Sequence, residues 1–330
     1  MKSTTPVSPI ELKFCHAVSS KHFMHTDVLT PWANAIEERT GDRIKIIFYP
    51  EGTLFNTRET YNAILTGDTD ISLSSLGYTP DPFPLTAVLF LPYVSSLPAQ
   101  VVTRIYHHLY EKFPQMREEY SSIKLLWFMT HGPTGLMSKN KPIRRLEDIQ
   151  NISVRANGPL ASVVKQLGGN PVGMPAPNIY NAMENGTIEA MFVPFEGLIS
   201  FNLHEQSKYL TIGAAALYGA MCVGMNLDVW NSFPPDIQKI IDEESAKAAD
   251  LSIKGWDKED QKGIDFAKSR GQEVIYLSSE EMVRWREKIR PLWYQWVADT
   301  EAKKLHGKQV LDETLRLFNK YEKGSSYRSA

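Results

Sequence analysis

The chain has 330 residues, 42% of them hydrophobic and 22% charged, which is enough to form the cores of two ordinary domains. The formal net charge is -2 and no run of lysine or arginine occurs, which argues against a nucleic-acid partner. No apolar run reaches the length of a membrane-spanning helix. The polar N-terminal residues 1–11 show no signal peptide, although an exported chain whose leader had been removed would look the same.

The first third of the chain alternates between strand and helix patterns. Residues 10–18 and 43–50 are typical of strands, and 22–39 between them is typical of a helix that stops at Thr-Gly-Asp. A second helix is predicted over 57–67 and a third strand over 68–75. This order predicts a parallel, doubly wound sheet.

A short repeat indicates two similar α/β lobes. Tyr-Asn-Ala begins at Tyr61 and again at Tyr180, and Gly67 and Gly186 follow at the same offset. Each copy has the pattern of a helix, a glycine stop and a strand, which favours two related lobes over one large domain. We expect lobe I to comprise residues 1–130 and 219–255, and lobe II to comprise 131–218 and 256–330 with the C-terminal helices.

Arg155 stands in a short apolar strand, 152–156, directly before a predicted helix over 159–167. Ligands of open α/β sheets bind at the carboxyl ends of strands, and a guanidinium group there matches a carboxylate. The alternative is an ordinary surface charge or a structural ion pair. The pattern alone leaves both open.

Later segments predict a strand over 220–230, a long helix over 233–271 and a strand over 272–277. An aromatic-rich helical tail follows over 278–305, with an expected break near Pro291. Its three tryptophans are predicted to pack in the protein rather than against a ligand; they are Trp285, Trp293 and Trp296.

No catalytic or cofactor motif is present: the sequence has no phosphate-binding, dinucleotide-binding, nucleophile-elbow or zinc-protease signature. His22 and His25 are three residues apart near His16, but without a carboxylate partner they predict no metal site. We therefore expect neither an enzyme nor a cofactor. Cys15 and Cys222 lie in apolar runs and are predicted to be buried free thiols rather than a disulfide.

The chain resembles the DctP-like solute-binding proteins of TRAP (tripartite ATP-independent periplasmic) transporters. The most specific residues are Lys-Pro-Ile at 141–143, Leu-Glu-Asp-Ile at 146–149, Ile-Ser-Val-Arg-Ala at 152–156 and Leu-Gly-Gly-Asn-Pro-Val at 167–172. Matching stretches run in the family's order from Glu11 to about Gly271.

The resemblance implies an α/β, two-lobed periplasmic-binding-protein-like fold with a hinge and a long helical C-terminal segment. It implies that Arg155 holds the carboxylate of a small organic acid in an interlobe cleft, and that the lobes close around this ligand. It also implies a periplasmic protein, with its signal peptide removed, that serves the membrane components of a TRAP transporter without inserting into the membrane itself.

Two departures from the family pattern bear on the ligand. Val193 precedes Pro194 where the family often has asparagine, and His131 is the nearest candidate for a second basic residue. These departures predict a less polar pocket than that of a sugar-acid binder. The further candidates for ligand contact are His22, Tyr78, Trp127, Phe195 and Tyr218.

The sequence therefore predicts a binding protein for a small monocarboxylate with an apolar or aromatic body. A small sulfonate is the nearest alternative, because arginine would also hold that group. An enzyme acting on a small acid in the same cleft is the alternative from another class. Each candidate residue other than Arg155 could equally serve the core, and His131 could be a loop residue held by backbone hydrogen bonds.

Overall fold

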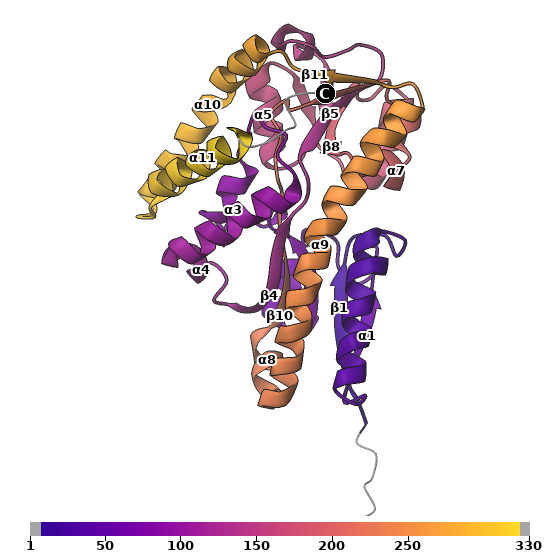
Figure 1. Ribbon diagram of the computed structural model, residues 1–330, viewed down its shortest axis with the longest axis vertical. Coiled ribbons are helices and arrows are strands. Elements are labelled where there is room, and N and C mark those ends of the chain that lie inside the picture. The colour runs from indigo at the N-terminus through magenta and orange to yellow at the C-terminus, as the bar shows by residue number, and fades with distance from the viewer. Residues whose placement is uncertain (1–7, 324–330) are drawn as a thin grey trace, which may run out of the picture. The chain divides into compact units, whose positions relative to one another are not determined.

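The structure is a computed structural model that describes residues 8–323, so most of the polar N-terminal stretch lies outside the described residues. The chain divides into two compact units, which are described separately (Figure 1). Unit 1 comprises residues 1–79, 118–129 and 221–255, and unit 2 comprises 80–117, 130–220 and 256–330.

Unit 1 contains a five-stranded sheet in the order β2-β1-β3-β10-β4. Its strands are β1 (Ile10–His16), β2 (Ile44–Tyr49), β3 (Ile71–Ser75), β4 (Ile123–Thr130) and β10 (Ala220–Asn226). β1 pairs in parallel with both β2 and β3, as the alternating pattern predicts. β10 pairs antiparallel with β3, so the complete sheet is mixed.

The helices of unit 1 are α1 (Thr30–Arg39), α2 (Thr60–Thr66), α8 (Leu227–Ser232) and the first part of α9 (Pro235–Ser269). A π-helical segment, Met24–Leu29, leads into α1. This segment and α1 together correspond to the predicted helix. A 3-10 turn, Leu76–Tyr78, follows β3.

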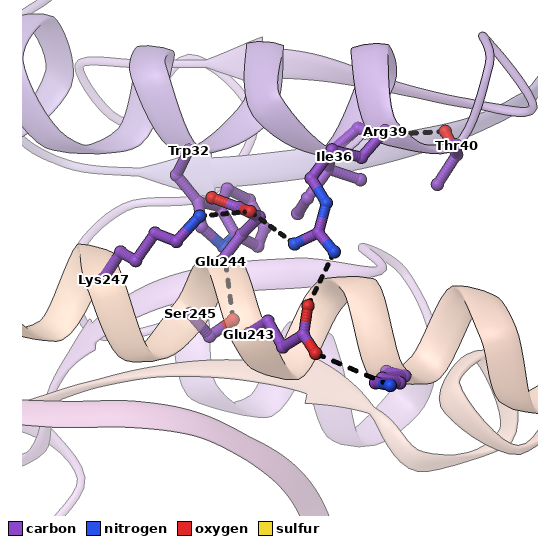
Figure 2. A network of polar contacts seen from close by, with 9 residues as sticks. Trp32, Ile36, Arg39, Thr40, Glu243, Glu244, Ser245 and Lys247 are labelled. Atoms are coloured by element: carbon purple, nitrogen blue, oxygen red, sulfur yellow. Dashed lines mark hydrogen bonds and ion pairs between the residues drawn. The ribbon is translucent and has the colours of Figure 1, made fainter.

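Polar contacts join α1 to α9 within unit 1 (Figure 2). The Arg39 guanidinium donates to Glu243 and Glu244, both at 2.6 Å, and the Trp32 indole N–H donates to the Ser245 hydroxyl at 3.2 Å. Trp32 also meets Phe14 of β1 edge-to-face, with ring centroids 5.8 Å apart. Because Trp32, Phe14 and Ser245 are buried, this contact ties α9 to the core beneath α1.

Unit 2 contains a six-stranded sheet in the order β11-β9-β5-β8-β6-β7. Its strands are β5 (Thr134–Ser138), β6 (Ser153–Arg155), β7 (Asn170–Val172), β8 (Ala190–Pro194), β9 (Tyr209–Ile212) and β11 (Glu273–Tyr276). β6 runs parallel to both neighbours, β7 and β8. β5 is antiparallel to both β8 and β9, so this sheet is also mixed.

The helices of unit 2 are α3 (Ala99–Lys112), α4 (Pro114–Glu118), α5 (Pro159–Leu167), α6 (Ile179–Glu184), α7 (Gly197–Ser200), the second part of α9, α10 (Ser279–Ala302) and α11 (Gly307–Lys323). Short 3-10 turns occur at Thr86–Phe90, Leu146–Ile149, Ala176–Asn178 and Leu203–Glu205. Within residues 8–323, no helix is both long and apolar enough to cross a membrane.

The two copies of the sequence repeat fall in different units. α2 and β3 carry the first copy in unit 1, and α6 and β8 carry the second in unit 2. Gly67 and Gly186 both adopt φ +77°, a conformation that glycine tolerates better than other residues. The repeat therefore corresponds to a helix–glycine–strand element in each unit, as predicted.

The division differs from the expected lobes mainly at residues 80–117, which the sequence assigns to lobe I and which belong to unit 2. The cause is α3, which packs against α11 (Figure 1). Glu313 of α11 lies 2.6 Å from the His108 imidazole and 3.0 Å from the Lys112 ammonium group. Contacts with α11, about 200 residues later in the sequence, thus place α3 in unit 2.

The expected break at Pro291 is wrong, because α10 continues through it. Pro291 is exposed, so the carbonyl group that loses its N–H partner can be hydrated. Buried side chains on both sides, Ile289 and Trp293, hold the helix against unit 2. The predicted start is confirmed, since the Ser278 hydroxyl accepts from the Glu281 N–H at 3.2 Å.

Replacing Gly263 by alanine is expected to destabilise the protein by about 1–3 kcal/mol, because a Cβ atom would overpack the interior. That atom would lie 2.1 Å from the Phe195 carbonyl oxygen. Inside a helix, replacing glycine by alanine normally stabilises a protein by about 0.5–1 kcal/mol. A loss of stability would therefore indicate the close contact with Phe195. Urea denaturation measures the effect. Lys258→Ala, at an exposed position of α9, is the control, and a stabilised Gly263→Ala protein would contradict the close approach.

Candidate functional site

Arg155 is the last residue of β6, and the chain turns sharply after it. Gly158 has φ +51° and ψ -129°, a backbone conformation favoured by glycine, and Pro159 occupies the first turn of α5. The turn therefore follows from the Gly-Pro pair. Only 7% of the Arg155 surface is exposed, so the residue is not an ordinary surface charge.

Both neighbouring strands contribute carbonyl groups to the Arg155 guanidinium. Its Nε and Nη2 donate to the Met174 carbonyl, just beyond β7, at 3.3 and 3.2 Å. Its Nη1 donates to the Phe192 carbonyl of β8 at 3.1 Å. The Asn157 amide nitrogen donates to the same Met174 carbonyl at 2.6 Å. These contacts fix the plane of the guanidinium at the carboxyl end of β6.

Sequence analysis did not identify the groups that position Arg155. They are the main-chain carbonyls of Met174 and Phe192, which carry no side-chain signal. Asn157 bonds the same Met174 carbonyl, and its position two residues after Arg155 is the only feature of the sequence that could have suggested it.

The His131 imidazole bonds backbone groups through both ring nitrogens. Nδ1 lies 2.6 Å from the Gly132 carbonyl, and Nε2 accepts from the Gly219 N–H at 2.9 Å. This arrangement requires the neutral tautomer protonated on Nδ1. Burial lowers the pKa of His131, which agrees with a neutral ring. The geometry is that of a loop residue held by backbone hydrogen bonds, the alternative that the sequence left open.

Val193 and Phe195 belong to the hydrophobic core of unit 2, together with residues of α6 and α7. Phe195 packs directly on Gly135, where a Cβ atom would lie 2.1 Å from the Phe195 ring. Val193 is 3% exposed in the same cluster. Because Val193 packs in this core, its apolar side chain does not indicate how polar a ligand pocket is.

Tyr218 is also a buried residue of unit 2. Its hydroxyl donates to Ser95 at 3.3 Å, and its ring meets Phe318 of α11 edge-to-face, with centroids 5.7 Å apart. Burial raises the pKa of the Tyr218 phenol, so the group stays protonated. Its contacts are those of a core residue.

Three candidate residues lie in separate elements of unit 1. The Trp127 indole donates to the Ser252 hydroxyl at 3.2 Å. The Nδ1 of His22 accepts from the Met24 N–H at 3.1 Å, at the start of the π-helical segment. Tyr78 ends the 3-10 turn after β3 and is partly exposed. Trp127 and His22 thus have structural partners within their own unit.

The histidines near the start of the chain bond one another. Nε2 of His16 and Nδ1 of His25 are 3.0 Å apart, and burial lowers the pKa of His16 to about 4. Among residues 8–323, no three side chains of the metal-binding types are grouped to hold an ion. Cys15 and Cys222 are buried free cysteines, as predicted, and burial raises the pKa of each thiol, to about 11 and about 12.

Known structures share this fold. The chain aligns with a TRAP solute-binding protein from a marine metagenome, described as specific for aromatic acid ligands, at a TM-score of 0.85 and 24% identity, covering 94% of this chain and 99% of that one. It also aligns with a TRAP periplasmic solute-binding protein from Desulfovibrio salexigens at a TM-score of 0.84 and 29% identity, covering 96% and 98%.

Sequence comparison extends the relationship. The 2,3-diketo-L-gulonate-binding periplasmic protein YiaO of Escherichia coli is 22% identical over 275 residues, which cover 83% of each chain. The model of the DctP family matches residues 14–300 of this chain. The match begins within β1 and ends within α10, so α11 lies outside it and Arg155 lies inside it. The chain belongs to the DctP family, bacterial extracellular solute-binding protein family 7.

Proposed function

We propose that the protein captures a small organic carboxylate, with Arg155 as its anchor, and delivers it to the membrane components of a TRAP transporter from the periplasm. The main support for this proposal is the position of the Arg155 guanidinium, which carbonyl groups on both sides hold at the carboxyl end of β6. Membership of a solute-binding family supports a role in ligand capture.

The orientation of the guanidinium suggests how the acid would bind. We place the ligand carboxylate against the edge formed by Nη1 and Nη2, beside the bonds that Nε and Nη2 make to the Met174 carbonyl and Nη1 makes to the Phe192 carbonyl. Two parallel N–H···O bonds to a charged group are stronger and more directional than a single neutral bond. In this low-dielectric site the ion pair is also screened less than in water. A sulfonate could use the same edge, and it remains the closest alternative ligand.

We propose an apolar or aromatic body for the acid. Met174 and Phe192 reach the guanidinium through their carbonyl groups, so the support for this body comes from a similar protein. The similar marine-metagenome protein is specific for aromatic acids, which agrees with this choice. The Escherichia coli relative binds 2,3-diketo-L-gulonate, so a sugar acid is the comparison ligand.

Benzoate is expected to bind at least about tenfold more tightly than glucuronate in titration calorimetry. Each sugar hydroxyl buried without a partner would cost about 1–3 kcal/mol, and a tenfold ratio corresponds to about 1.4 kcal/mol. Benzamide, a neutral molecule of similar shape, is the control for the charge, and benzenesulfonate tests the alternative anion. Tighter binding of glucuronate would overturn the apolar body but not the anchor. Equal binding of benzamide and benzoate would overturn the anchor.

The enzyme alternative has a separate test. We propose that the bound acid is released unchanged, because the chain carries no recognisable nucleophile, cofactor or metal motif. Prolonged incubation with benzoate followed by mass spectrometry should return benzoate alone. A new product formed in proportion to protein would support the enzyme instead.

A further inference from the structure

His131 lies near three of the places where the chain passes from one unit to the other. These boundaries fall between residues 129 and 130, 220 and 221, and 255 and 256. His131 is the second residue after the first boundary, Gly219 is the second residue before the next, and Trp256 is the first residue after the third. All three residues belong to unit 2. Contacts of His131 with Gly219 and Trp256 are therefore contacts among three connecting segments.

His131 joins these segments through both its backbone and its ring. Its N–H donates to the Gly219 carbonyl at 3.3 Å, and its Nε2 accepts from the Gly219 N–H at 2.9 Å. The ring also meets the Trp256 indole, with centroids 5.9 Å apart. One turn further along α9, Asp260 packs on the Gly132 backbone so closely that a Cβ atom there would overlap its carboxyl group. The contacts of His131 with Gly219 and Trp256 are called the latch below.

The latch requires an uncharged imidazole. Nδ1 donates to the Gly132 carbonyl at 2.6 Å, which leaves the lone pair of Nε2 for the Gly219 N–H. A proton on Nε2 would set two donors against each other. The ring is also packed closely on Gly219, where a Cβ atom would overlap Nε2. Protonation of His131 therefore breaks the bond that its ring makes between two of the connecting segments.

The titratable groups on the elements around His131 are Glu196, Tyr218, Asp257 and Asp260. Burial lowers the pKa of His131, and the Glu196 carboxylate raises it by less. Burial raises the pKa of Asp260 well above its usual value, so this carboxyl favours its neutral form and does not draw a proton to the ring. Burial also raises the pKa values of Asp257 and of the Tyr218 phenol. The surroundings therefore favour the neutral ring while the latch is formed.

We propose that His131 is a pH-sensitive latch on the segments that connect the two units. At neutral pH its uncharged ring holds Gly219 beside the segment 130–134, and uptake of a proton on Nε2 releases Gly219. Burial holds the pKa of the latched ring below its ordinary value of about 6.5. The latch therefore stabilises unit 2 fully above about pH 6.5 and is lost as the pH falls through the lowered pKa, because only the released ring takes up a proton readily.

Hydrogen exchange of the Gly219 amide reports the latch directly, because this N–H donates to His131 Nε2. In the ligand-free protein, its protection, measured by NMR spectroscopy and corrected for the intrinsic rate, should fall about tenfold from about pH 7.5 to about pH 5.0. His131→Gln keeps an acceptor near the position of Nε2 but takes up no proton, so its protection should stay constant within about threefold. His306→Gln, at an exposed histidine of the same unit, should respond like the wild-type protein.

A second variant keeps the test decisive if His131→Gln fails to fold. His131→Phe keeps a flat ring beside Trp256 but has no acceptor for the Gly219 N–H. This amide should exchange at least about tenfold faster than in the wild-type protein at about pH 7.5, with no further loss at about pH 5.0. Unchanged protection of the wild-type amide between the two pH values would overturn the proposal. So would a wild-type pH response in His131→Gln, its absence in His306→Gln, or wild-type protection in His131→Phe.

Discussion

Arg155→Ala is expected to fold and to bind the carboxylate ligand about 2–5 kcal/mol more weakly, the usual cost of truncating one partner of a buried charge pair. Arg155→Lys should not restore affinity, because an ammonium group cannot reproduce the planar fork that spans Met174 O and Phe192 O. Calorimetry with benzoate measures both effects. Near-native affinity of the alanine variant would show that Arg155 is not the anchor.

Arg155→Ala also removes the donor to the buried Phe192 carbonyl, whereas the Met174 carbonyl keeps Asn157 as a donor, so the variant carries a separate cost in stability of about 1–3 kcal/mol. Thermal unfolding without ligand measures that cost and separates it from the loss of affinity. Arg104→Ala is the matched control, because Arg104 is an exposed arginine of the same unit, on α3. It should change neither quantity appreciably.

Local patterns predicted the strands and helices around Arg155 well. The Gly-Pro turn after β6 and the paired glycines Gly67 and Gly186 depend on backbone preferences that short stretches of sequence encode. The cysteines were also predictable, because free cysteines in apolar runs are usually buried.

The orientation of Val193 was not predictable from alternation. β8 is buried on both faces, so consecutive residues Met191, Phe192 and Val193 are all apolar and the period-2 signal disappears. The site partners of Arg155 were hidden for another reason, since carbonyl groups look alike in every sequence. The place of α3 in unit 2 was not predictable either, because nothing in its local sequence indicates that His108 and Lys112 contact Glu313.

Trp285→Ala is expected to cost about 3–5 kcal/mol of unfolding free energy, the largest stability effect we predict. Trp285 is 0% exposed on α10, the helix that packs against α5. Removing its indole would leave a cavity that the surrounding helices and sheet can fill only in part. Urea denaturation of the unbound protein measures the loss, and an effect below about 1 kcal/mol would contradict the assigned core position.

Phenylalanine at the same position separates volume from hydrogen bonding. The Trp285 indole N–H has no hydrogen-bond partner among the described residues, so Trp285→Phe deletes a buried donor that already costs stability. Trp293, buried on the same helix, donates its N–H to the Pro92 carbonyl at 2.8 Å. Trp293→Phe breaks that bond and leaves the carbonyl without its donor. We therefore expect Trp293→Phe to be more destabilising than Trp285→Phe, by about 1 kcal/mol, although the two substitutions remove the same atoms. The reverse order would mean that the Trp285 N–H makes a favourable contact and that its burial is not a cost to the fold.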